Sequence, residues 1–176
     1  MGEKLFGFQR LCLLLVFGLS GCVSLPRSFH ALSYKNQTVY LDRNHFYKVG
    51  PLSDDWKITL GKYPGIVFKN RVNEATVVIE AICGGGFEDL SLGLLTQNLV
   101  AGLGAIQKLK KENWKLSDRD ALHTLAHVTL DGIAVSLDIV ILKKGGCEFD
   151  FYAISLPQYE AEVSRDFETF VKGFDY

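Results

Sequence analysis

The sequence predicts an α+β domain, in which strands form a sheet and two main helices pack on it. Three observations lead to this class. Short extended segments occupy the first part of the chain, and the spacing of apolar residues then changes to a helical one after residue 87. Three further extended segments and a final helical segment follow. Runs of strands alternating with runs of helix are typical of layered α+β domains.

The early strand candidates are bounded by turn residues. Residues 56–60 (WKITL) alternate apolar and polar side chains, which is the pattern of a half-buried strand. Residues 76–83 (TVVIEAIC) are mostly β-branched or apolar and precede three glycines at 84–86. The complete set of early strands that we expect is 38–41, 56–60, 65–69 and 76–83.

Residues 87–111 carry the first helical pattern. Apolar residues recur at the spacing of one helix face, at Leu92, Leu95, Leu99, Leu103, Ile106 and Leu109. Glu88 and Asp89 would lie in the first turn, where the helix dipole favours acids. The run Lys108, Lys110 and Lys111 would lie in the last turn. We interpret this run as a solvated helix end, with contact to anionic lipid as the alternative.

The C-terminal part predicts three strands and a helix. The strands are 121–130, 132–142 and 147–155, and Asp131-Gly132 between the first two is a strong hairpin signal. Pro157 suits the first turn of the closing helix. The apolar face of that helix is expected to consist of Tyr159, Val163, Phe167, Phe170 and Val171.

The first 21 residues have the form of an export signal. Lys4 and Arg10 precede an apolar run, residues 11–17. This run is shorter than a membrane-spanning helix, which needs about 20 residues. The segment ends in Leu19-Ser20-Gly21-Cys22, which resembles the bacterial lipobox. That resemblance implies a diacylglyceryl group on the Cys22 thiol and cleavage of the signal before it. An ordinary secretory signal that happens to end in Gly-Cys is the alternative.

The lipobox divides the chain into three parts. We expect a lipoprotein signal peptide at 1–21, a lipidated tether at 22–37 and a single α+β domain at 38–176. Acyl chains on Cys22, such as palmitate, would hold the domain on a bacterial membrane, because two or more chains anchor stably. The domain would face the periplasm. Val23 stands where an aspartate retains many lipoproteins in the inner membrane, which favours the outer membrane.

Two of the four cysteines remain in the exported domain. Cys12 leaves with the signal and Cys22 is lipidated, so Cys83 and Cys147 are left. Disulfides persist in the oxidising compartments that exported proteins occupy. Two cysteines allow only one bridge. The sequence leaves open whether they form this bridge or remain free thiols.

The C-terminal segment resembles the last half of the PsbP-like fold, which small bacterial lipoproteins share. The resemblance rests on the hairpin at Asp131-Gly132, the aromatic segment 148–152 (EFDFY) and the closing segment 167–174 (FETFVKGF). It implies a curved antiparallel sheet with helices on its faces. It implies no shared enzymatic activity, since proteins with this fold mainly bind other macromolecules.

Three candidate sites do not reach a complete chemical motif. His123 and His127 are four residues apart, but no glutamate follows the first one as in His-Glu-x-x-His metal sites, and on a strand they would lie too far apart for one ion. The glycines at 84–86 could cradle a phosphate, yet Glu88 and Asp89 would repel it. The aromatic residues of 149–152 and 167–174 are expected to form the core, although some could line a lipid or peptide groove.

The charge and motif patterns therefore point away from catalysis. The formal net charge is −1, without the clustered basic excess typical of nucleic-acid binding. We expect no enzyme, no cofactor and no metal. The expected function is that of an accessory or binding subunit of a cell-envelope complex, with a protein partner. A carrier or sensor of an apolar small molecule or lipid is the second hypothesis, and a hydrolase is a distant third.

Overall fold

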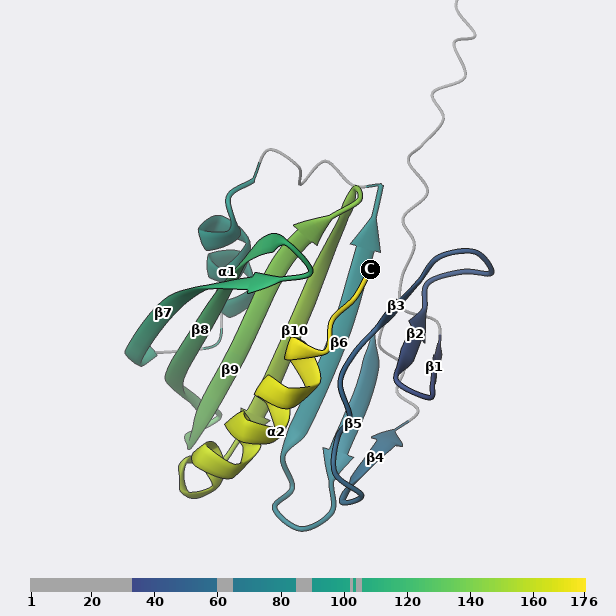
Figure 1. Cartoon of the computed structure of the whole chain (residues 1–176). Coiled ribbons are helices and arrows are strands. Elements are labelled where there is room, and N and C mark those ends of the chain that lie inside the picture. Colours follow the sequence, from purple (N-terminus) through teal and green to yellow (C-terminus); the bar gives the residue numbers. More distant parts are fainter. Residues whose placement is uncertain (1–32, 60–64, 85–89, 102, 104–105) are drawn as a thin grey trace, which may run out of the picture.

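The structure is a computed structural model, and it describes residues 33–59, 65–84, 90–101, 103 and 106–176. These residues form a seven-stranded sheet, a three-stranded sheet and two α-helices, with every strand pair antiparallel (Figure 1). The predicted α+β class is confirmed. The expected signal peptide and Cys22 lie outside the described residues. Within the described part, no helix is both long enough and apolar enough to cross a membrane.

The large sheet contains six of the strands that the sequence predicts. Its strands, in spatial order, are β4 (Trp56–Thr59), β5 (Ile66–Asn70), β6 (Thr76–Cys83), β10 (Cys147–Ser155), β9 (Ile133–Lys144), β8 (Arg119–Leu130) and β7 (Ile106–Leu116). Asp131 and Gly132 have φ angles of 50° and 83°, as a two-residue hairpin turn between β8 and β9 requires. The hairpin that the sequence predicted at this position is therefore confirmed.

The predicted helix 87–111 is wrong over much of its length. The first helix, α1, spans only Leu92–Val100, with Ser91 as its N-cap. Its C-cap, Ala101, already has an extended backbone with ψ of 124°. Glu88 and Asp89 therefore precede the helix instead of filling its first turn, and they lie outside the described residues. The glycines at 102 and 104 follow the end of the helix in the sequence and lower helix propensity by up to about 1 kcal/mol each, which disfavours its continuation toward residue 111.

Residues 106–116 form the edge strand β7 instead of the end of a helix. Most of its side chains are exposed on both faces, so its sequence shows no clean alternation of apolar and polar residues. Ile106 and Leu109 happened to continue the helical spacing of α1. Lys108, Lys110 and Lys111 lie along an open sheet edge, where charged side chains oppose pairing with another chain.

The first three strands of the described chain form a small sheet that packs against the C-terminal segment. It contains β1 (Ser33–Lys35), β2 (Thr38–Tyr40) and β3 (Phe46–Lys48), of which only β2 was predicted. β1 lies within 22–37, the range expected to be a tether, so ordered chain begins before residue 38. The backbone of the β3 residue Lys48 forms an isolated antiparallel β-bridge with that of Asp175, with two N–H···O hydrogen bonds.

The two helices cover opposite faces of the large sheet (Figure 1). The second helix, α2 (Glu160–Lys172), follows a 3-10 turn, Pro157–Tyr159, so the predicted helix start at Pro157 is confirmed. Four of the five residues predicted for its apolar face, Val163, Phe167, Phe170 and Val171, are buried in α2. The fifth, Tyr159, lies in the 3-10 turn and is half-buried. The four buried residues pack with the small sheet and one sheet face into the main core. α1 covers a smaller apolar cluster on the other face.

A close backbone contact joins the end of α2 to the segment after β3. The N–H group of Gly50 donates to the carbonyl oxygen of Phe170 at 2.6 Å. A Cβ atom at Gly50 would lie 2.1 Å from the carbonyl oxygen of Thr169. Glycine at position 50 therefore permits the two segments to touch.

We expect Gly50→Ala to lower the free energy of unfolding by about 1–3 kcal/mol, as overpacked sites do. The added carbon meets backbone atoms, which cannot rotate away. Chemical denaturation measures the change. Gly93→Ala in α1 is the matched control, because its Cβ would meet only the Ser91 hydroxyl at 3.9 Å. That variant should be neutral or slightly more stable, and equal losses in both variants would contradict the contact argument.

Candidate functional site

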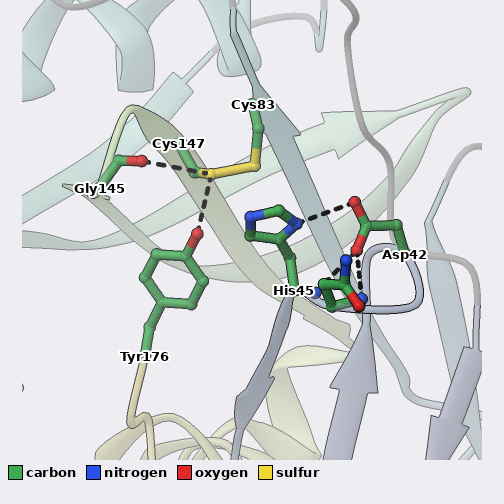
Figure 2. Close-up of polar contacts among 7 residues, drawn as sticks. Asp42, His45, Cys83, Gly145, Cys147 and Tyr176 are labelled. Carbon is green, nitrogen blue, oxygen red and sulfur yellow. Dashed lines mark hydrogen bonds and ion pairs between the residues drawn. A yellow bond between two sulfur atoms is a disulfide. The ribbon is translucent and has the colours of Figure 1, made fainter.

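Cys83 and Cys147, whose pairing the sequence left open, form a disulfide (Figure 2). Cys83 ends β6 and Cys147 begins β10, and the two residues are directly paired in the ladder, with their Cα atoms 4.0 Å apart. Both are buried, with exposed fractions of 7% and 3%. The bridge therefore fixes one end of the two central strands, and neither sulfur is available as a thiolate nucleophile or metal ligand.

The side chain of Tyr176 contacts this bridge (Figure 2). The Tyr176 hydroxyl donates to the Cys147 Sγ atom at 3.5 Å, since a disulfide sulfur has no hydrogen to give. Nearby, the Asp42 carboxylate accepts from the backbone N–H groups of Asn44 and His45 and contacts the His45 ring at 2.8 Å. The Asn44 hydrogen bond is the largest cause of a lowered pKa at Asp42. These contacts order a turn and support no reaction by themselves.

The two histidines singled out by the sequence lie on β8 and face α2. The His123 Nε2 atom is 2.6 Å from the Asp138 carboxylate of β9, and the His127 Nε2 atom is 2.5 Å from the Glu160 carboxylate of α2. Each histidine thus has its own acid. In the described part of the chain, no group of three or more His, Cys, Asp or Glu side chains is arranged to hold a metal ion.

Hydroxyl groups complete both acid–histidine pairs. Ser164 of α2 donates to the second oxygen of Asp138 at 2.7 Å, and Ser136 of β9 donates to Glu160 at 2.6 Å. Burial alone would raise the pKa of Glu160, but the hydrogen bonds from Ser136 and His127 outweigh burial and lower it. Among the described residues, the hydrogen-bond partners of the two histidines are the carboxylates of Asp138 and Glu160, whereas nucleophilic catalysis by a histidine base needs a hydroxyl or thiol in contact with it.

An open polar recess of about 220 Å³ lies over these residues, between α2 and strands β7 to β9. Its charged and polar lining is Lys110, Glu112, His123, Asp138, Glu160, Ser164 and Glu168. Lys110 donates to Glu112 at 2.5 Å, and this hydrogen bond is the main cause of a lowered pKa at Glu112. The recess can bind a small polar group.

A second recess, of about 140 Å³, lies on the opposite face of the sheet beside α1. Its lining is almost entirely apolar: Leu99, Leu103, Leu130, Leu137, Ile139, Tyr152 and Ile154. Ligand pockets for drug-sized molecules enclose about 300–1,000 Å³. The recess is thus large enough for a small ring or a short chain and too small for a whole lipid.

Three acidic side chains lie on the same face as α1, near the disulfide end of the sheet. Asp150 is directly paired with Glu80 across the β10–β6 ladder, and Glu148 is two residues away on β10. The Asp150 side chain is mostly buried and its Oδ1 atom has no hydrogen-bond partner. Burial, followed by the charges of Glu148 and Glu80, raises the pKa of Asp150 to about 8.

The remaining predicted residues have structural roles or lie outside the described part. Phe149, Phe151, Phe167, Phe170 and Phe174 are buried in the main core, whereas Tyr152 faces the apolar recess. The core interpretation of these aromatic residues is thus confirmed. Gly84 has a φ of 75°, as a glycine turn after β6 requires, but the following residues 85–89 are outside the described residues. The phosphate interpretation of this loop stays untested.

Sequence reasoning missed the partners of the two histidines. Asp138, Ser136 and Glu160 were assigned only to predicted strands or to the polar side of the last helix. The predicted hairpin turn did contain a signal for one pair, because it aligns β8 with β9 and brings Asp138 beside His123 on one face. No sequence signal indicates that α2 lies against this part of the sheet.

The chain matches no family model, and no curated protein matches it by sequence. Several solved structures share its fold. LpqN, involved in cell envelope biogenesis of Mycobacterium tuberculosis, is 13% identical; the match covers 84% of this chain and 90% of LpqN, with a TM-score of 0.53. The cyanobacterial PsbP protein (CyanoP) of Synechocystis is 14% identical; the match covers 90% of this chain and 98% of CyanoP, also with a TM-score of 0.53.

A third structure, from Bacteroides thetaiotaomicron, is 14% identical with a TM-score of 0.53. The match covers 73% of this chain and 44% of that protein, so this chain spans less than half of it. At such identities the likeness concerns the fold alone. The resemblance to the PsbP-like fold, an antiparallel sheet with helices on both faces, is confirmed.

Proposed function

We propose that the chain is a bacterial lipoprotein, anchored by lipid on Cys22, whose domain is a non-enzymatic accessory or binding subunit of a cell-envelope complex. The observation that carries the proposal is the Cys83–Cys147 disulfide downstream of an export-type N-terminus. Disulfides persist in oxidising compartments such as the periplasm. The motif Leu19-Ser20-Gly21-Cys22 supplies the anchor, and Val23 favours the outer membrane.

Two further points support the binding part of the proposal. LpqN, which shares this fold, is described as involved in cell envelope biogenesis. In addition, His123 and His127 are engaged with carboxylates, without a nucleophile in contact with them. A protein partner in the envelope is therefore proposed ahead of any substrate.

Cys22→Ser is expected to move the full-length protein from the membrane fraction to the soluble fraction of a Gram-negative host. It should also abolish the acyl mass on the N-terminal peptide, because the thiol is the acyl acceptor. Fractionation and mass spectrometry measure the two effects. Cys12→Ser is the matched control, since Cys12 lies in the segment that is removed. A Cys22→Ser protein that still carried the acyl mass, or an unmodified Cys22 in the unaltered chain, would refute the anchor.

The same membranes test the accessory role. The tagged, gently solubilised protein should co-purify with an envelope protein in a fixed ratio. The apolar recess beside α1 favours one alternative, a carrier of a small apolar molecule. A bound apolar compound without any protein partner would support that alternative and contradict the accessory role.

A further inference from the structure

The small sheet has one face that points away from the core. Tyr34, Val39 and Tyr47 are paired across its three strands, and all three belong to the main core or pack against it. Neighbouring residues of a strand point to opposite sides, so the residues before and after this row point outward. They form two rows across the sheet, the first of Ser33, Tyr40 and Phe46 and the second of Lys35, Thr38 and Lys48. We call these six residues the outer face.

Two aromatic rings lie side by side on the outer face. Tyr40 and Phe46 are directly paired, with ring centroids 6.1 Å apart and exposed fractions of 36% and 51%. In the part of the chain that the structure describes, no other aromatic side chain is exposed. Contact between the two rings stabilises the hairpin, but it leaves them open to solvent. Tyrosine is enriched at membrane–water interfaces, and phenylalanine is typical of the apolar side of interfacial elements.

The second row of the outer face is basic. Lys35 and Lys48 are exposed, and Arg43 is exposed in the turn between β2 and β3. Two acids lie nearby: Asp175, whose backbone is bridged to Lys48, and Asp42, whose carboxylate accepts from backbone N–H groups of its own turn. This region therefore carries more positive than negative charge, although the whole chain has a formal net charge of −1. Basic side chains can reach lipid phosphates while their methylene groups lie along apolar surface.

The chain enters the described domain on this same face. Ser33, the first described residue, belongs to the aromatic row. It is the eleventh residue after Cys22, which corresponds to at most about 40 Å even for fully extended chain. With lipid on Cys22, the outer face is therefore the part of the domain that is joined most directly to the bilayer.

We propose that the outer face lies on the lipid surface in which Cys22 is anchored, with the rings of Tyr40 and Phe46 at the level of the headgroups and the lysine row against lipid phosphates. This inference rests on the proposed lipid anchor and adds the orientation in which the domain is held. Anchoring makes the contact intramolecular, so a face that binds lipid only weakly by itself is occupied once the anchor is inserted.

Quenching by lipid measures this contact. The acylated, full-length Phe46→Trp protein is reconstituted into vesicles of equal parts phosphatidylcholine and phosphatidylglycerol, with or without bromine on the acyl chains near the headgroups. The unaltered protein gives the background of Trp56 and Trp114. We expect brominated lipid to lower the fluorescence of the added tryptophan about two-fold, because its ring lies at the depth of the bromine atoms.

Ile133→Trp is the matched control. Ile133 begins β9 in the large sheet, and its exposed fraction of 58% is close to that of Phe46. A tryptophan at position 133 should be quenched no more than the background. Equal quenching at the two positions, or no quenching at position 46, would overturn the proposal.

A pair of double variants tests the lysine row in the Phe46→Trp protein. Lys35→Gln with Lys48→Gln should lower the quenching in the mixed vesicles and leave it unchanged in pure phosphatidylcholine, because only phosphatidylglycerol attracts the lysines. Lys57→Gln with Lys69→Gln removes two exposed, directly paired lysines of the large sheet and should have no effect. The same loss of quenching in both double variants would contradict the role of the lysine row.

Two readouts separate the orientation from the anchor and from a protein contact. The mass of the N-terminal peptide shows whether Cys22 is acylated in the same sample. An unmodified Cys22 would refute both the anchor and the orientation, whereas an acylated protein without quenching at position 46 would refute the orientation alone. If the emission at position 46 shifted to the blue only when a co-purifying envelope protein was present, the outer face would belong to that protein and lipid contact would be overturned.

Discussion

Replacing both Cys83 and Cys147 by alanine should lower the free energy of unfolding by about 4 kcal/mol, as expected for a bridge across a long loop. The bridge joins residues 64 positions apart, so it removes many conformations from the unfolded chain. The folded state should change little, because β6 and β10 remain paired over the rest of their length. Urea denaturation under non-reducing conditions measures the loss.

A reducing agent provides the control for this pair of substitutions. It should lower the stability of the unaltered protein to that of the Cys83→Ala/Cys147→Ala variant and leave the variant itself unchanged. A loss below about 1 kcal/mol would contradict the entropic argument, whose usual range is 2–4 kcal/mol. A similar loss for Cys147→Ala alone would agree with it, since one substitution already opens the loop.

Elements whose apolar pattern is bounded by turn residues were predictable from the sequence. β10 occupies Cys147–Ser155, the range predicted, because its aromatic run is bounded by a glycine turn on one side and by Pro157 on the other. The final helix was predictable because its apolar spacing faces a large core. In both elements local propensity and tertiary packing favour the same structure.

β7 was not predictable for a physical reason. An edge strand exposed on both faces has no buried side to impose alternation, so Ile106 and Leu109 could equally be read as part of a helix. The turn that joins β7 to β8 adds to the difficulty. Ser117 and Asp118 both adopt positive φ angles, of 47° and 62°, without the glycine that usually marks such a turn.

Which side chains meet at the candidate sites depends on the registers of the strand pairs, and the sequence specifies these registers only in part. The Asp131-Gly132 turn aligns β8 with β9 and so brings His123 near Asp138. Pairing of Cys83 with Cys147 would likewise have aligned Glu80 with Asp150, but the sequence left that bridge open. The contacts that Ser164 and Glu160 of α2 make with Asp138 and His127 arise from the packing of segments distant in sequence, and no local sequence pattern indicates them.

The alignment of Glu80 with Asp150 leads to a large expected effect of pH on the stability of the domain. Asp150 is 9% exposed, its Oδ1 atom has no hydrogen-bond partner, and Glu148 is a further acid on the same strand face. Burial is the main cause that raises its pKa to about 8, and the charges of Glu148 and Glu80 add to it. We therefore expect the folded protein to keep a proton on Asp150 at neutral pH, where the unfolded chain has lost it.

The sign of the effect follows from this difference in bound protons. Below about pH 3.9, the ordinary pKa of an aspartate, both states are protonated and the folded state has no penalty. Above that value only the folded state retains the proton, so stability falls as pH rises toward about 8. Each unit of difference in pKa corresponds to about 1.4 kcal/mol, which makes the total loss on the order of 5 kcal/mol.

Asp150→Asn should remove this loss, because an amide of nearly the same shape stays neutral at every pH. We expect the variant to be several kcal/mol more stable than the unaltered protein at pH 8 and about equal to it at pH 4. Urea denaturation at intervals between these values measures both curves. Asp120→Asn, which removes an exposed carboxylate, is the control and should leave the curve unchanged. If the unaltered protein were equally stable from pH 5 to pH 8, or Asp150→Asn were less stable at pH 8, a protonated Asp150 would be excluded.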